Sequence, residues 1–299
     1  MDNTTTVPGL ANMPQPTTDT ADSVNPGTLN LNSLIASLSS HAKYKARSHD
    51  TSKNVHIPLL QSHLRDFPAG GPKMVLLGDS MFERMTTTGQ SPNFPTPWPS
   101  PALFPSPDSP GLPSEEKGRR FEGVFNAGVG GDKIQNVIYR LVGDEERGLP
   151  GLLPILVGSV QLWVVHVGTN NLSPKKGWSR ADEAALWGLV GALLAANPTC
   201  KVVLTQLFAR TDVPWEIVCG VNETVKGIAK RLGEEVGSSQ VDYWNPPGGN
   251  TWLSMEKHLD DHVHLNLEGY RLWVEALHPL FRRFVEERAE TEKTTTTPA

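Results

Sequence analysis

The sequence predicts an α/β fold in which helices cover both faces of a parallel sheet. Short apolar runs, typical of buried strands, alternate along the chain with segments of helical periodicity. This alternation is characteristic of parallel strands joined by helical crossovers. With 299 residues, of which 38% are hydrophobic and 20% charged, the chain can bury the core of such a domain.

Five short apolar runs are the predicted strands: Met74–Leu77, Val124–Asn126, Leu162–Val167, Val202–Leu207 and Val241–Tyr243. Helices are expected to begin near Ser80, Asp132, Ser179, Pro214 and Leu267. Two of these helices have a start signal. Ser179 has Asp182 three residues later, which approximates a capping box, and Asn266 is a good N-cap residue before the last helix.

The two ends of the chain are expected to be disordered tails around a domain of residues 56–288. Residues 1–55 are rich in Thr, Pro, Asn and Ser, and residues 289–299 are also polar, so neither can bury enough apolar surface to offset the entropy of ordering. One helical face interrupts the first tail, formed by Leu31, Leu34, Ile35 and Leu38. It is interpreted as a transient helix in the tail, or as a docking or membrane-surface helix.

A proline-rich segment, residues 86–120, follows the first strand and helix. Its closely spaced prolines disfavour both helix and central strand, so a long polyproline-like loop is predicted. Three interpretations stay open: a lid over a site, a surface insertion, and a ligand for a proline-binding partner. For a lid, the side chains that could cover an acyl chain are Phe94, Trp98, Leu103 and Phe104.

Charge and cysteine content exclude several classes of function. Lys and Arg total 27 against 32 acidic residues, a net charge of −5, so no basic surface for nucleic acid is expected. Cys200 and Cys219 form neither a disulfide framework nor a C-x-x-C zinc motif. The first residues lack a secretory pattern, and no apolar run reaches the roughly 20 residues of a membrane span. We expect a cytoplasmic protein without stable membrane insertion; a homo-oligomer is left open.

Polar residues or glycines follow each of the first three predicted strands. Ser80 lies where the first strand turns into a helix, which in open α/β sheets faces the ligand crevice. Gly131 ends a glycine cluster after the second strand. Lys133 stands where the dinucleotide-binding pattern G-x-G-x-x-G needs its third glycine, so a backbone N–H that donates to an oxyanion is a better interpretation of the cluster than a dinucleotide-binding loop. Asn170 follows the third strand and can donate an amide N–H to the same point. Each segment alone is more often a cap or a turn.

The run His258–His264, with the sequence HLDDHVH, precedes the last predicted helix. Asp261 and His264 stand three residues apart, a spacing that lets a carboxylate orient an imidazole whose other nitrogen deprotonates a serine. Asp260 lacks a histidine at this spacing. Three histidines and two aspartates would also suit zinc or iron, and a solvated loop is the third interpretation.

The order of these blocks resembles the SGNH hydrolases, the GDSL-type esterase and lipase family. The matching blocks are Gly78-Asp79-Ser80, the glycines through Gly131, Gly168-Thr169-Asn170 and Asp261-His262-Val263-His264. Within that family the sequences of these motifs resemble those of the intracellular platelet-activating-factor acetylhydrolases. The resemblance covers residues 56–288 and implies a three-layer α/β/α sandwich with a parallel five-stranded sheet of flavodoxin-like topology. The proline-rich segment and the long first tail are departures from the family.

The resemblance implies a serine esterase that cleaves carboxylic esters through an acyl-enzyme, without cofactor or metal. Ser80 would be the nucleophile, His264 the general base and then acid, and Asp261 the residue that orients it. The oxyanion hole would consist of the Ser80 N–H, the Gly131 N–H and the Asn170 side chain. The substrate would be a small-molecule or lipid ester.

Met81 and Val263 adjoin the nucleophile and the base in sequence, so they are candidates to wall the acyl pocket. Their bulk indicates a short acyl group, and ordinary core packing is the alternative. Two other classes of function remain open: a metal-dependent hydrolase that uses the histidines of residues 258–264, and a non-catalytic interaction module.

Overall fold

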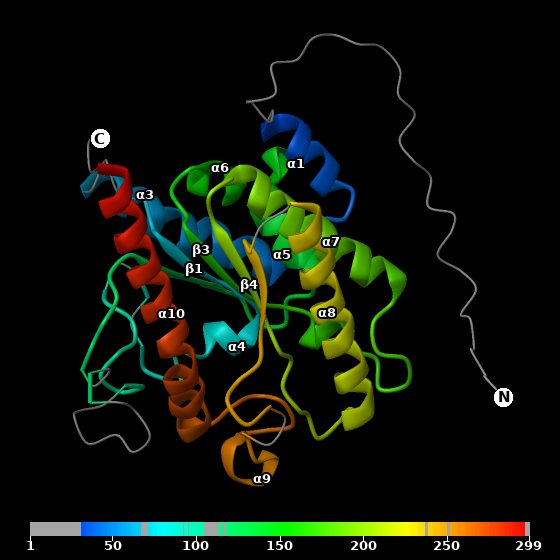
Figure 1. Cartoon of the computed structure of the whole chain (residues 1–299). Coiled ribbons are helices and arrows are strands. Elements are labelled where there is room, and N and C mark those ends of the chain that lie inside the picture. Colours follow the sequence, from blue (N-terminus) through cyan, green and yellow to red (C-terminus); the bar gives the residue numbers. More distant parts are fainter. Residues whose placement is uncertain are drawn as a thin grey trace, which may run out of the picture.

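A parallel sheet of five strands forms the centre of the molecule (Figure 1). The computed structural model describes residues 31–66, 71–91, 93–94, 96–104, 114–115, 118–236, 239–249 and 252–296. The strands are β1 (Met74–Gly78), β2 (Val124–Gly128), β3 (Leu162–His166), β4 (Lys201–Thr205) and β5 (Val241–Trp244). They lie in the order β2-β1-β3-β4-β5, and every neighbouring pair is parallel. This order is flavodoxin-like, and it confirms the predicted fold class.

The five predicted helices are present as α4 (Ser80–Glu83), α5 (Ile134–Val142), α7 (Arg180–Ala196), α8 (Trp215–Glu235) and α10 (Leu267–Thr296). The structure adds α1 (Leu31–Ser39), α2 (Ala46–Thr51), α3 (Ile57–Asp66), α6 (Leu153–Leu156) and α9 (Met255–His258), and the shorter or irregular turns η1 (Ser52–His56), η2 (Glu145–Arg147) and η3 (Thr169–Asn171). Both predicted start signals are confirmed. Asp182 Oδ2 accepts from the Ser179 N–H, and Asn266 Oδ1 accepts from the Gly269 N–H, both at 2.9 Å.

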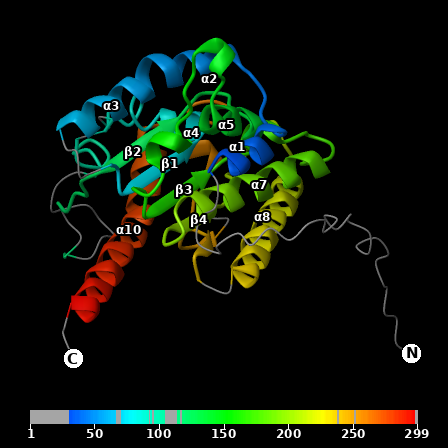
Figure 2. The ribbon, with the colours of Figure 1, turned by 90° about the horizontal axis from the view of Figure 1, so that it is seen from above.

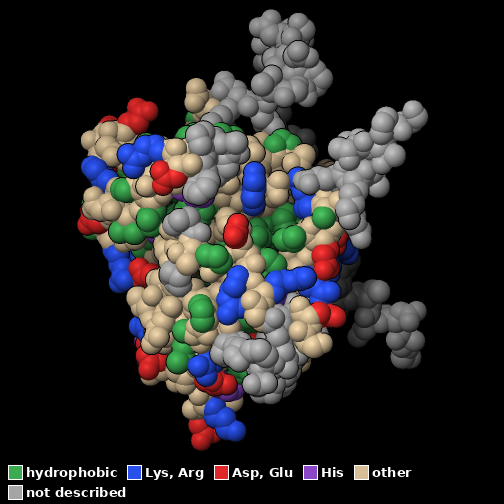
Figure 3. All heavy atoms as spheres, turned by 90° about the vertical axis from the view of Figure 1, so that its left-hand side faces the viewer, with side chains coloured by type: hydrophobic (Ala, Val, Ile, Leu, Met, Phe, Trp, Pro, Cys, Tyr) green, Lys and Arg blue, Asp and Glu red, His purple; other side chains and the backbone are tan. Residues whose placement is uncertain are grey.

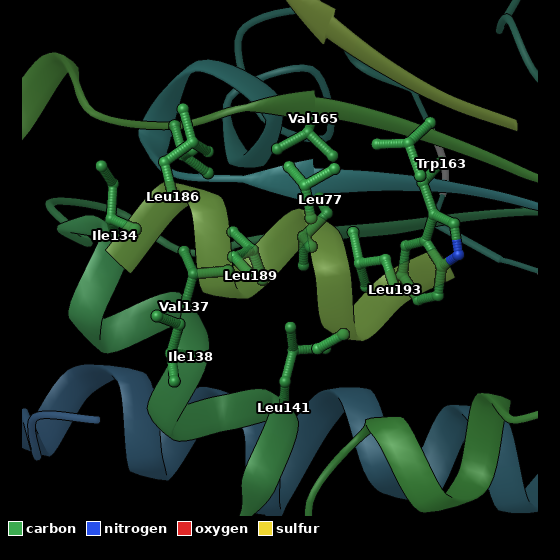
Figure 4. Packing of buried hydrophobic residues seen from close by; sticks show 14 of the residues in the cluster. Leu77, Ile134, Val137, Ile138, Leu141, Trp163, Val165, Leu186, Leu189 and Leu193 are labelled. Carbon is green, nitrogen blue, oxygen red and sulfur yellow. The ribbon is translucent and has the colours of Figure 1, made fainter. Parts of the chain in front are cut away.

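The strands separate two hydrophobic clusters because successive side chains point to opposite faces. Val75 and Leu77 of β1 pack with α5, α7 and α8, whereas Leu76 packs with α4 and α10. Figure 1 shows the sheet between α10 on one side and α7 and α8 on the other. Figure 4 shows Leu77 and Val165 of the strands facing side chains of α7. The result is a three-layer α/β/α sandwich.

Most of residues 31–55, expected to belong to a disordered tail, instead lie in α1, α2 and η1; the expectation for residues 1–30 lies outside the described residues. The predicted helical face is α1, and it docks on this domain, with Leu38 buried against α7. Figure 2 shows α1 beside α7 and α2 near α5. Polar contacts hold the rest of this segment on the domain; for example, Ser48 Oγ donates to the buried Asp132 carboxylate. Few apolar residues therefore suffice to order the segment.

The C-terminal boundary also differs from the prediction, because α10 continues to Thr296 and only the last three residues lie outside the described part. Acidic and basic side chains alternate on this helix and form i,i+4 pairs such as Arg282–Glu286 and Arg283–Glu287. Figure 3 views the face that includes α10, on which red and blue side chains are interspersed. No helix of the described residues is both long and apolar enough to cross a bilayer.

The described part of the proline-rich segment is not a cover for an acyl chain. Its four large side chains, Phe94, Trp98, Leu103 and Phe104, are all buried in the two core clusters. Trp98 pairs with Phe121 by two backbone hydrogen bonds and contacts Phe281 of α10. The lid interpretation is wrong for these side chains because the flank of α10 and β2 offers them an apolar surface. Residues 92, 95, 105–113 and 116–117 lie outside the described residues.

Candidate active site

The candidate active site lies at the carboxyl ends of β1, β2 and β3. Ser80 is the first residue of α4, directly after β1, and it is 6% exposed. Asp79 caps this helix, because its Oδ1 accepts from the Met81 N–H at 2.9 Å. Gly128, the last residue of β2, lies so close to α4 that a Cβ would overlap the backbone of Glu83. Glycine there lets the loop after β2 approach the serine.

Ser80, His264 and Asp261 form one hydrogen-bonded chain. His264 Nε2 lies 2.8 Å from Ser80 Oγ, and His264 Nδ1 lies 2.7 Å from Asp261 Oδ2. Both hydrogen bonds form together when Nδ1–H donates to the carboxylate and Nε2 accepts a hydrogen bond from the Ser80 hydroxyl. This is the arrangement a nucleophile, its base and an orienting acid need.

The Asp261 carboxylate is fixed from its other side by the backbone. Its Oδ1 accepts from the N–H groups of Val263 and His264, each at 2.8 Å. Although burial opposes it, the hydrogen bonds from His264 and Val263 hold the pKa of Asp261 well below its usual range. The carboxylate is therefore ionised at neutral pH and available to stabilise an imidazolium.

Arg84 is a contact of this site that sequence reasoning missed. Its guanidinium lies 3.7 Å from Asp261 Oδ2 and 3.5 Å from Asp260 Oδ2. Asp260 thus pairs with the arginine while Asp261 contacts the imidazole as well. A signal was available, since Arg84 stands four residues after Ser80 and so lies on the same side of that helical turn.

The three expected oxyanion donors surround the same strand ends. Within the described residues, the N–H groups of Ser80 and Gly131 donate to no protein acceptor, so both are available to a ligand. Asn170 follows β3, and its Nδ2 donates to the carbonyl of Asp132 at 3.0 Å. A second, long contact of 3.4 Å joins this Nδ2 to Asp79 Oδ2. Because this contact is long and therefore weak, the N–H that makes it can reorient toward a substrate at little cost in free energy.

A buried charge network ties two of the strand ends together. Arg140 Nε and Asp132 Oδ2 are 2.7 Å apart, and both side chains are fully buried. The same guanidinium donates to the carbonyls of Gly78 and Ala127, at the ends of β1 and β2. Close by, burial raises the pKa of the Asp79 carboxyl to about 7, helped by the charge of Asp132.

The two expected pocket residues lie in different surroundings. Met81 is 1% exposed and belongs to the core cluster shared with α10. Val263 is 7% exposed and belongs to neither of the two described core clusters. Packing in that core cluster explains why Met81 is buried. Val263 is buried outside both clusters, so it stays a candidate for the wall of the acyl pocket.

The three histidines of the run 258–264 make different contacts. His258 Nδ1 accepts from the Ser254 N–H at 2.9 Å, and His262 lies 3.9 Å from Asp212 and 4.0 Å from Asp261. His264 contacts Ser80 and Asp261, as described above. Among the residues that the structure describes, no three His, Cys, Asp or Glu side chains are grouped to hold a metal ion.

Comparison with known proteins gives a family match and several similar folds. Residues 76–272 match the GDSL-like lipase/acylhydrolase family. A GDSL-like lipase from Bacteroides thetaiotaomicron is 16% identical with a TM-score of 0.42, covering 85% of this chain and 98% of its own. A carbohydrate esterase family 3 protein from Talaromyces cellulolyticus is also 16% identical, with a TM-score of 0.46, covering 72% of this chain and 99% of its own.

A lipase/acylhydrolase from Enterococcus faecalis is 19% identical with a TM-score of 0.40, covering 70% of this chain and 96% of its own. Among curated proteins, none matches the sequence. The family match spans 197 of the 299 residues, well over half of the chain, and contains every block of the site described above. The chain therefore belongs to the GDSL-like lipase/acylhydrolase family and is a carboxylic ester hydrolase.

Proposed function

We propose that this protein is a serine esterase that cleaves a short-acyl carboxylic ester through an acyl-enzyme on Ser80 Oγ. The observation that carries the proposal is the unbroken hydrogen-bonded chain from Ser80 through His264 to Asp261. Each group in it has a donor or acceptor free for the step that it would perform.

In the first half of the reaction, Ser80 Oγ attacks the ester carbonyl carbon and its proton passes to His264 Nε2. The carbonyl oxygen becomes an oxyanion that accepts hydrogen bonds from the N–H groups of Ser80 and Gly131 and from Asn170 Nδ2. Asp261 stabilises the imidazolium that forms. When the intermediate collapses, the C–O bond breaks, and Nε2 returns the proton to the leaving alkoxide.

In the second half, a water molecule takes the place of the alcohol. His264 Nε2 accepts one proton from this water while the oxygen of the water attacks the acyl carbon. The second tetrahedral intermediate releases the carboxylic acid, and the proton returns to Ser80 Oγ. No further group is required, because the imidazole alternates between base and acid.

The proposed preference for short acyl groups is supported by the burial of the residues next to the nucleophile and the base. Ser80 and both of its candidate pocket neighbours, Met81 and Val263, are buried. A long acyl chain would have to displace packed side chains, which costs more than an acetyl group entering beside them.

Hydrolysis of p-nitrophenyl esters from acetate to decanoate tests both parts of the proposal. We expect turnover to be greatest with the shortest acyl groups, and Ser80→Ala to remove it together with labelling by a fluorophosphonate. Ser159→Ala is the matched control, because Ser159 lies before β3, away from the site, and its hydroxyl donates to the Leu156 carbonyl. Wild-type turnover by Ser80→Ala would refute the proposal. The cytoplasmic location remains a prediction from the sequence, which cell fractionation can check.

A further inference from the structure

Lys45 reaches the glycine loop after β2 from the N-terminal part of the chain. It stands directly before α2, and its Nζ donates to the carbonyl of Gly130 at 2.8 Å. The same ammonium lies 3.6 Å from the buried Asp132 carboxylate. A Cβ built on Gly131 would lie 2.8 Å from Nζ, so the ammonium is beside that residue.

The carbonyl that Lys45 holds and the Gly131 N–H belong to the same peptide group. In a trans peptide the C=O and N–H bonds point in opposite directions. When the carbonyl points at Lys45, the N–H is therefore turned away from it. The contact decides the direction of this donor.

This peptide group needs an external restraint because it lies between two glycines. Gly131 has a φ of 73°, and glycine adopts positive and negative φ about equally well, so little in the local backbone opposes rotation of the group. Within the described residues, the Gly130 carbonyl accepts a hydrogen bond from Lys45 alone. Rotation would break this charge-assisted bond.

We infer that Lys45 is a positioning residue that fixes the Gly130–Gly131 peptide as an oxyanion donor. The inference rests on the proposed function, which takes the Gly131 N–H as part of the oxyanion hole. A cation on the carbonyl also polarises the peptide, which makes its N–H a stronger donor. Lys45 thus acts on the oxyanion without touching the substrate.

The backbone around Lys45 is itself fixed on α5 and the glycine loop. Before it, the Lys43 N–H donates to the Gln135 carbonyl at 3.0 Å, and the Lys43 carbonyl accepts from Asn136 Nδ2 at 2.8 Å. After it, Ser48 Oγ donates to Asp132. Hydrogen bonds on both sides of Lys45 in the chain therefore hold its ammonium group in one position.

Lys53 provides a matched control in the same N-terminal segment. Its Nζ donates to the carbonyl of Arg147 at 2.9 Å, and the next residue, Gly148, has a φ of 67°. The ammonium–carbonyl hydrogen bond is of the same kind, although Lys45 also faces the Asp132 carboxylate. Arg147 and Gly148 lie in the turn after α5 and belong to no block of the site. A general effect of losing such a hydrogen bond from this segment would therefore affect Lys45 and Lys53 variants alike.

The test compares Lys45→Met, Lys45→Gln, Lys45→Arg and Lys53→Met in the full chain on p-nitrophenyl acetate. Because Lys45 acts through a donor, we expect Lys45→Met to lower kcat about tenfold, less than the roughly 10²–10³-fold loss on removing a donor outright. KM should stay within about twofold, since the oxyanion forms only in the transition state. The rate of fluorophosphonate labelling should fall in proportion to kcat.

We expect Lys45→Arg to retain most of kcat, Lys45→Gln to be intermediate because its amide keeps the hydrogen bond without the charge, and Lys53→Met to match the wild type. Thermal unfolding identifies any variant that fails to fold, and Lys45→Gln and Lys45→Arg then give the answer. Wild-type kcat in folded Lys45→Met and Lys45→Gln would overturn the inference, as would an equal loss in Lys53→Met. If Ser80→Ala itself stays active, the proposed function fails instead.

Discussion

Replacing Asp261 by Asn tests the orienting role of this carboxylate with an almost isosteric change. The structure predicts which way the new amide lies. The Oδ1 position accepts from two backbone N–H groups, so only the amide oxygen can occupy it. The amide nitrogen then takes the Oδ2 position, 2.7 Å from His264 Nδ1.

An N–H facing Nδ1 forces the wrong tautomer on the imidazole. Nδ1 must accept, so the proton moves to Nε2, which can then no longer take the proton of Ser80. The lost charge-assisted hydrogen bond alone is worth about 1.5–3 kcal/mol. Together with the tautomer change, the expected fall in kcat is about 10⁴-fold, or roughly 5.4 kcal/mol at 1.36 kcal/mol per factor of ten.

Asp260→Asn is the matched control, because Asp260 also contacts Arg84 but not the imidazole. The assay is steady-state hydrolysis of p-nitrophenyl acetate at pH 7, with thermal unfolding to verify the fold. We expect Asp260→Asn to stay within about threefold of the wild type, as surface ion pairs contribute little. Equal losses in the two variants, or a folded and fully active Asp261→Asn, would refute the reasoning.

Three further outcomes are expected. Asn170→Ala should lower kcat roughly 10²–10³-fold at constant KM; a raised KM with unchanged kcat would make Asn170 a binding residue. Asp79→Asn should stabilise the protein at pH 8 and hardly at pH 4, because the folded-state pKa of about 7 exceeds the usual 3.8, so ionisation weakens the fold as pH rises between them. Its melting temperature at the two pH values checks this, and equal shifts at both would contradict it. Activity should survive prolonged dialysis against EDTA; loss that zinc or manganese restores would favour the metal-dependent alternative.

The sheet could be predicted because its strands are continuous apolar runs, and the site because its residues directly follow those runs. Ser80 and Asn170 are placed by the ends of β1 and β3, which local sequence reveals. The position of Arg84, four residues after Ser80, gave a signal near the nucleophile, but the contact of Lys45 could not be found in this way. It joins Lys45 to Gly130, far apart in the chain, and depends on how separate elements pack.

The helices within residues 31–55 and the burial of the large side chains of the proline-rich segment were not predicted, for a related reason. Composition describes what a segment can bury on its own, whereas Leu38 and Phe104 are buried on surfaces supplied by α7 and α10. Polar residues such as Ser48 add order through single hydrogen bonds to buried partners. Average hydrophobicity does not record either effect.

The buried ion pair of Arg140 and Asp132 links catalytic competence to the cooperative unfolding of the whole sheet. Arg140 binds the carbonyl of the last residue of β1, Gly78, and that of the next-to-last residue of β2, Ala127, so the peptide groups leading to Ser80 and Gly131 cannot open without exposing an unpaired buried charge. Such regions exchange their amide hydrogens only through global unfolding. On heating, the loss of activity should therefore coincide with melting of the domain and not precede it.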